Sequence, residues 1–150
     1  MSVYYNEIYQ MFHKIFEKII SNKYFHQINK EYNLEFIDYL FLKNIKNLND
    51  CSISDLYECL DINYGQISRK IDKLKQLGFI DKRISKKDER KKNLVLTKRG
   101  KDIYKEIDRL INKYIQFIIK DFTVNEEKAV LKFLSKISQI TYVDIEKDLK

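Results

Sequence analysis

Residues 53–80 decide the fold, and they read ISDLYECLDINYGQISRKIDKLKQLGFI. In the first part of this stretch, Ile53, Leu56 and Leu60 recur at helical spacing, and a preceding serine, Ser52 or Ser54, can cap a helix. The residues that follow Leu60 are turn formers. We therefore expect a short helix over residues 53–60 that ends in a tight turn.

A second apolar stripe follows the turn, formed by Ile67, Ile71 and Leu74. This spacing predicts a helix over residues 63–77, and Gly78 supplies the left-handed residue that ends it. Two short helices joined by a tight turn form a helix-turn-helix motif.

The second helix of this motif carries the side chains that read base edges. On a helical wheel of about 100° per residue, its polar face lies about 180–260° from Ile67. Gln, Arg and Lys on such a face suit base and phosphate contacts, whereas the alternative is an ordinary solvated helix face. The candidate DNA-binding residues of this helix are Gln66, Ser68, Arg69, Lys70 and Lys73.

A charged hairpin follows the second helix. Residues 79–85 and 93–97 alternate as β-strands do, and a strongly charged segment of residues 86–92 separates them. Such a tip cannot pack against a core, so a contact with phosphates or the minor groove is its natural use. The candidate DNA-binding residues of the tip are Lys86, Lys87, Arg90 and Lys91.

Helical spacing predicts further helices on both sides of this region, over residues 3–29, 34–46, 97–120 and 123–147. The first and the last two are too apolar for solitary exposure, which favours a homodimer, although packing within one chain explains the same stripes. We expect a mainly α fold with a small β-hairpin wing, a winged helix-turn-helix with N- and C-terminal dimerisation helices. The predicted organisation is one domain over residues 1–150, with the winged helix-turn-helix at 34–100 and dimerisation helices at 1–30 and 101–150.

The positive charge of the chain is concentrated in the same region. The 150 residues carry a net charge of +7, and residues 61–101 alone carry +9, with four of the five arginines. Arginine clustering favours binding of a polyanion, here double-stranded DNA, over the alternative of a merely lysine-rich, solvated surface.

Several other classes of function are disfavoured. Without proline and with only three glycines, the chain has no Gly-rich phosphate loop, and it shows no nucleophile elbow or paired-carboxylate motif, so we expect no enzyme. Its two histidines, thirteen residues apart, have no acid or cysteine at ligand spacing, so we expect neither a metal nor a cofactor. The absence of an export signal and of a membrane-spanning apolar run predicts a cytoplasmic protein without membrane contact.

The helix-turn-helix and the hairpin together resemble the MarR family of bacterial transcriptional regulators. The matching residues are Ile53-Ser54-Asp55-Leu56, Ile67 to Leu74, Leu77-Gly78-Phe79-Ile80, Arg83, Asp88-Glu89-Arg90 and Leu94 to Gly100. The last of these resembles the family's wing motif, Asp-x-Arg followed by a strand and Leu-Thr-x-x-Gly. The lysine-rich composition is also similar to that of the SarA-like branch.

This resemblance implies a homodimeric regulator, expected to be a repressor, that binds a pseudo-palindromic operator. It makes Arg90 the wing arginine of the minor groove and Asp88 the carboxylate that holds the wing in shape. Physical reasoning agrees about Asp88, because an acid that contacted DNA would repel phosphate. Glu89 departs from the family pattern, in which this position is often basic, and removes one phosphate attraction.

The resemblance also implies a small, often aromatic effector bound between the dimerisation helices and the DNA-binding lobe. His13, Tyr24, His26 and Tyr39 are candidates to line such a cleft, although each is better explained as a packed or half-exposed side chain.

The two cysteines, Cys51 and Cys59, are too far apart to pair within one helix. We expect Cys59 to be buried beside Leu56 and Leu60, and Cys51 to lie in an exposed turn, with redox sensing as the weaker interpretation of either. An alternative function for the whole chain is a winged-helix adaptor that binds protein and lacks specific DNA binding.

Overall fold

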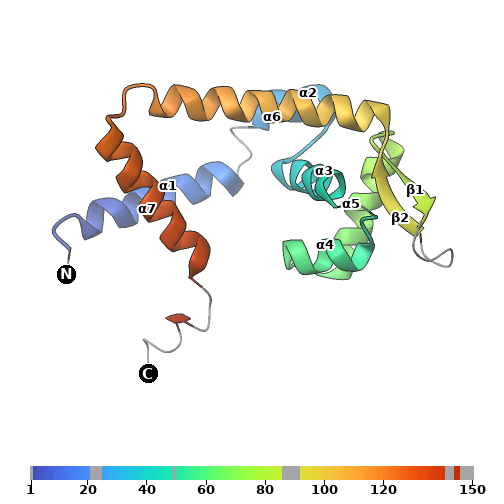
Figure 1. The fold of residues 1–150 in the computed structure, drawn as a ribbon, viewed down its shortest axis with the longest axis horizontal. Coiled ribbons are helices and arrows are strands. Elements are labelled where there is room, and N and C mark those ends of the chain that lie inside the picture. Colours follow the sequence, from blue (N-terminus) through green and yellow to red (C-terminus); the bar gives the residue numbers. More distant parts are fainter. Residues whose placement is uncertain (1, 21–24, 49, 86–91, 141–143, 146–150) are drawn as a thin grey trace. The chain divides into compact units, whose positions relative to one another are not determined.

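The computed structural model describes residues 2–20, 25–48, 50–85, 92–140 and 144–145. In chain order, the elements are α1 (Tyr5–Ile20), α2 (His26–Tyr32), α3 (Phe36–Asn47), α4 (Ile53–Leu60), α5 (Tyr64–Gln76), β1 (Ile80–Ile84), β2 (Lys92–Leu96), α6 (Lys98–Ile119) and α7 (Val124–Gln139) (Figure 1). The chain forms two compact units, residues 1–108 and 109–150, and the boundary between them lies within α6. Mostly helical with one antiparallel hairpin, the structure confirms the expected winged helix-turn-helix fold.

The hydrophobic core lies in the first unit. There α3 contacts α4 and β2, while α5 contacts α4 and β1, so the three short helices gather beside the hairpin (Figure 1). The apolar stripes predicted from the sequence point inward: Leu56 of α4 and Ile67, Ile71 and Leu74 of α5 are all buried. Each fully buried aliphatic side chain of this kind contributes about 1.5–3 kcal/mol through removal of apolar surface from water.

Local capping explains where the helices of the motif begin. Ser52 is the N-cap of α4, and its hydroxyl accepts a hydrogen bond from Asp55 N at 3.1 Å while Ser52 N donates to the Asp55 carboxylate at 2.7 Å. Asn63 caps α5, because its side-chain oxygen accepts from Gln66 N at 2.9 Å. Between the two helices, Asp61 adopts the left-handed conformation with φ 49°. Both helices of the motif therefore begin and end within one residue of their predicted bounds, and these short-range capping contacts explain why.

The end of α5 is a Schellman motif built on Gly78. This glycine has φ +74°, and Gly78 N donates to Lys75 O while Phe79 N donates to Leu74 O, both at 2.9 Å. The motif turns the chain directly into β1, which pairs with β2 in antiparallel register from Ile80 opposite Leu96 to Ile84 opposite Lys92. The predicted left-handed glycine is therefore confirmed, and it determines where the wing begins.

Thr97 and Gly100 join the wing to the start of α6. The Thr97 hydroxyl donates to Gly78 O at 2.7 Å and accepts from Gly100 N at 3.0 Å, while Thr97 N donates to Phe79 O at 3.0 Å. A Cβ atom at Gly100 would lie 1.9 Å from Phe79 O, a backbone atom with little room to move. The Leu-Thr-x-x-Gly sequence is thus needed for close packing of α6 on the wing.

Gly100→Ala is accordingly expected to destabilise the protein by about 3 kcal/mol, because the added methyl group must displace backbone. Gly65→Ala is the matched control, since its Cβ would meet only Asn63 Oδ1 at 3.4 Å, an ordinary contact, and we expect a change below about 1 kcal/mol. The midpoints of urea unfolding measure both effects. Equal midpoints for the two variants would contradict this account of Gly100.

Two of the predicted outer helices differ from the observed ones. The helix expected over residues 3–29 is replaced by α1 and α2, and α2 begins after Phe25, a buried ring 5.2 Å from that of Phe36. Packing of Phe25 on α3, a tertiary contact, explains this new start. The last helix was predicted to reach residue 147, but α7 ends at Gln139, where Ile140 takes an extended conformation.

The second unit has no buried residue among those the structure describes. Large apolar side chains of α6 and α7 are instead exposed: Phe117 is 66% exposed, Leu131 65% and Leu134 55%. α1 resembles them, with Tyr9, Met11, Ile15 and Phe16 about half exposed. In the single chain, the described residues of these outer helices therefore leave much of their apolar surface exposed.

Candidate nucleic-acid interface

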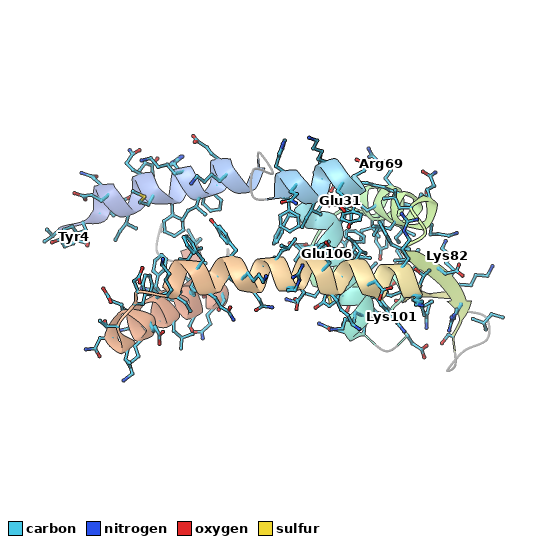
Figure 2. All side chains as sticks on the ribbon, turned by 90° about the horizontal axis from the view of Figure 1, so that it is seen from above. Tyr4, Glu31, Arg69, Lys82, Lys101 and Glu106 are labelled. Carbon is cyan, nitrogen blue, oxygen red and sulfur yellow. The ribbon has the colours of Figure 1, made fainter. Side chains whose placement is uncertain are left out.

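The exposed face of α5 presents three of the predicted DNA-binding side chains. Gln66, Ser68 and Arg69 are all exposed, whereas Ile67, Ile71 and Leu74 of the same helix are buried. Arg69 extends away from the ribbon (Figure 2), and its Nε donates to Gly65 O at 3.3 Å. That bond uses one of the five N–H donors of the guanidinium and orients the side chain along the helix, which leaves a donor fork suited to guanine or phosphate.

Lys70 and Lys73, the other two candidates on α5, have carboxylate partners in the fold. Lys70 Nζ is bonded to the Glu35 carboxylate and lies 3.1 Å from Asp38 Oδ1, and Lys73 Nζ lies 2.6 Å from Asp38 Oδ2. Their side chains are only 22% and 25% exposed, and that of Asp38 is fully buried. The structure thus separates these two lysines from the exposed trio, and DNA contact by either remains a prediction.

The described part of the wing adds cations outside the predicted set. Lys82 and Arg83 on β1 and Lys92 on β2 are exposed, and Lys82 points away from the hairpin (Figure 2). Their signal in the sequence was the concentration of charge around the hairpin, but the prediction favoured its tip. The predicted tip residues Lys86, Lys87, Asp88, Arg90 and Lys91 lie outside the described residues.

An aromatic pair lies at the start of α5. The rings of Tyr57 on α4 and Tyr64 on α5 stack with centroids 4.4 Å apart and planes 9° apart, yet they are 39% and 53% exposed. The stacked pair joins α4 and α5 at the edge of the exposed face of α5 that carries Gln66, Ser68 and Arg69, which we call the reading face. Neither tyrosine is among the DNA-binding residues predicted from the sequence.

An open depression lies beside α5, lined by Glu35, Ile37, Ile62, Gln66, Arg69 and Lys70. Two of the exposed candidates, Gln66 and Arg69, line it together with Glu35, the N-cap residue of α3. This proximity, between residues about 30 positions apart, has no signal in the local sequence pattern.

The candidate effector residues do not form a recognisable site in the described parts of the chain. Tyr39 is buried, its hydroxyl donates to Asp108 Oδ1 at 3.0 Å, and its ring stacks on Tyr104 at 5.7 Å. Burial, with help from Asp108, raises the pKa of Tyr39 above its ordinary value. Tyr39 is therefore a packed residue, as the alternative interpretation held. His13 and His26 are exposed, and Tyr24 lies outside the described residues.

The predicted environments of the two cysteines were wrong, because they are reversed in the structure. Cys51 is buried and Cys59 is exposed. Cys51 O accepts a hydrogen bond from Leu94 N at 2.7 Å, so the chain before α4 adds a β-bridge to the wing and loses contact with water. Burial, with smaller contributions from Asp55 and Cys59, raises the pKa of the Cys51 thiol to about 12.

A thiol-reactive disulfide reagent at pH 8 is therefore expected to modify one cysteine of the native protein rapidly, and that cysteine is Cys59. Only the thiolate reacts, and at pH 8 a thiol of pKa about 12 is almost wholly protonated as well as inaccessible. The released chromophore counts the reactive thiols, and Cys59→Ser is expected to remove the fast phase. Rapid modification of two thiols before unfolding would contradict the burial of Cys51.

Among residues 2–20, 25–48, 50–85, 92–140 and 144–145, no three His, Cys, Asp or Glu side chains gather as metal ligands would. No helix within these ranges is both long and apolar enough to span a bilayer.

Comparisons with known proteins agree with this geometry. Residues 23–107 match the family model described as "Transcriptional regulator SarA/Rot". The chain is 28% identical over 111 residues to the HTH-type transcriptional regulator BilQ of Clostridioides difficile (strain CD3). The aligned segment covers 74% of this chain and 75% of BilQ. It is also 28% identical over 112 residues to the HTH-type transcriptional regulator SarZ of Staphylococcus aureus (strain USA300). That alignment covers 75% of this chain and 72% of SarZ.

A solved structure shares the fold. Streptococcus pneumoniae FabT, determined in complex with DNA, superposes with a TM-score of 0.79 at 21% identity and covers 97% of this chain and 99% of FabT.

Proposed function

The chain belongs to the SarA/Rot family of transcriptional regulators, and from this premise we propose that it binds a pseudo-palindromic operator as a homodimer and acts as a repressor. The observation that carries the proposal is the division of α5 between exposed polar residues, Gln66, Ser68 and Arg69, and a buried apolar stripe, Ile67, Ile71 and Leu74. A helix that is polar and exposed on one side and buried on the other can insert its polar face into the major groove while the core holds its apolar face.

The wing supplies the second contact in this proposal. β1 packs against α5, and its exposed Lys82 and Arg83 place positive charge beside the reading helix. We assign these cations to phosphates, which position the protein without reading sequence. From the sequence alone, we assign further phosphate contacts to the tip residues Lys86, Lys87 and Lys91. The family resemblance assigns Arg90 to the minor groove and gives Asp88 the role of keeping the wing in shape.

The dimer in this proposal is formed by the outer helices. A unit as short as residues 109–150 cannot bury enough apolar surface alone, and its exposed Phe117, Leu131 and Leu134 need a partner. A second copy offers the same helices, and the resulting two-fold symmetry matches that of a palindromic operator.

Footprinting on the DNA upstream of the protein's own gene, followed by affinity measurements on the protected duplex, tests the proposal. We expect one protected segment, a steep loss of affinity as salt rises, and a preference of at least about 10³ over unrelated duplexes. Affinity that is weak, insensitive to salt and equal for all duplexes would contradict a regulator and favour a protein-binding adaptor. A small-molecule effector stays a prediction of the family resemblance.

A further inference from the structure

Four charged residues connect α3 to α5, and we call Glu35, Asp38, Lys70 and Lys73 the α3–α5 ion cluster. The start of α3 places both acids, because Glu35 is the N-cap and Asp38 follows three positions later in a reciprocal capping box. Glu35 N donates to Asp38 Oδ2 at 2.9 Å, which holds the Asp38 carboxylate at the helix end. From α5, the two lysines reach across to these carboxylates.

The cluster balances its own charge. Two ammonium groups meet two carboxylates, and the Asp38 carboxylate, fully buried, contacts both lysines at 3.1 and 2.6 Å. Burial acts to lower the pKa of Lys70, but its contacts with Glu35 and Asp38 outweigh burial and raise that pKa, so Lys70 stays charged. Withdrawal of either lysine would leave a buried carboxylate short of a partner, which is costly.

The cluster also lies next to the reading face. Glu35 and Lys70 line the same open depression as Gln66 and Arg69. A free lysine at this position would neutralise a phosphate and release a counterion on any duplex, which strengthens non-specific binding. A lysine already held by carboxylates gives no such gain.

We propose that Glu35 and Asp38 are specificity-determining residues of the operator-binding surface: they withhold Lys70 and Lys73 from phosphates and hold α5 against α3, so that Gln66 and Arg69 discriminate between sequences. This inference rests on the proposed DNA-binding function, and it replaces the prediction that Lys70 and Lys73 themselves contact DNA. In this role, the two acids do not act by repelling phosphate themselves. They act indirectly, through the lysines of α5 that they hold.

Glu35→Gln is the informative variant, because glutamine keeps an oxygen that can cap α3 but removes one of the two carboxylate charges that hold Lys70, while Lys73 remains as a partner of Asp38. We expect non-specific duplex affinity to rise roughly 5- to 10-fold at 0.1 M salt, and the slope of log affinity against log salt to steepen by about one. Operator affinity should gain less, so the ratio of operator to non-specific affinity falls. The probes are the footprinted operator duplex and a scrambled duplex of the same length and composition.

A double-mutant cycle separates this role from a general change of net charge. In a Lys70→Gln background, Glu35→Gln should no longer steepen the salt slope, because the lysine it would release is absent. Asp72→Asn, an exposed acid on α5, changes net charge equally and should have the same small effect with and without Lys70.

The outcomes are distinct. The inference is overturned if Lys70→Gln alone flattens the salt slope by about one while Glu35→Gln changes nothing, since Lys70 would then contact phosphate directly. Failure of the wild-type protein to bind any duplex overturns the proposed function together with this inference, whereas duplex binding with identical slopes for all variants overturns this inference alone.

Discussion

Leu134→Asp is expected to convert the protein from a dimer into a monomer and to weaken operator binding by roughly 10²- to 10⁴-fold. Leu134 lies on the apolar face of α7 and is 55% exposed in the single chain, so a partner must cover it in the proposed dimer. A carboxylate buried there without a counter-ion would cost about 3 kcal/mol or more. Once the dimer dissociates, the second half-site no longer binds at high effective concentration, and most of the affinity is lost.

Sedimentation equilibrium measures the first part of this result, since one chain has a mass of 18.2 kDa and the dimer twice that. Lys132→Gln is the matched control, because it changes net charge by the same amount on the polar side of α7. We expect it to remain dimeric and to bind the operator as the wild type does. A Leu134→Asp protein that stays dimeric would show that this face of α7 is not the dimer contact.

Arg69→Ala is expected to reduce operator affinity by about 5- to 150-fold, equivalent to roughly 1–3 kcal/mol, and to relax base preference at one position of each half-site. The reason is that Arg69 presents its guanidinium from the centre of the exposed face of α5, oriented by the hydrogen bond from Nε to Gly65 O. Competition between the operator and its single-base variants measures the loss of discrimination.

Lys87→Ala provides the comparison for Arg69→Ala. As a wing cation, Lys87 is expected to contact phosphate, so its loss should weaken binding to all duplexes alike and flatten the salt slope by about one. If Arg69→Ala weakened all duplexes equally and left every base preference unchanged, Arg69 would be a phosphate contact and the assignment of α5 as the reading helix would be contradicted.

The helix-turn-helix could be predicted from the sequence because its signals are local. Ser52 and Asn63 cap the two helices, Gly78 ends the second, and the stripe from Ile67 to Leu74 sets the buried face, all within a few residues of the structure they determine. The exposure of Gln66 and Arg69 follows from the same periodicity. For these elements, propensity and tertiary packing favour the same conformation.

The remaining features depend on contacts between distant parts of the chain. Lys70 and Lys73 looked like solvent-facing cations until α3 placed Glu35 and Asp38 against them. The bridge between Cys51 and Leu94 buries a cysteine whose own sequence context resembles an exposed turn. A helical wheel or a turn signal carries no information about such partners, which is why these environments had to come from the structure.

The central claim is that two chains bind two half-sites of one operator. The most direct test is the mass of the complex between the wild-type protein and its footprinted operator, measured by sedimentation equilibrium, together with the affinity for operators whose half-site spacing is changed systematically. The account predicts two chains per duplex, with the tightest binding when the half-sites lie one helical turn apart, about 10 base pairs from centre to centre. A saturated complex with one chain per duplex, or an affinity that does not depend on half-site spacing, would contradict it.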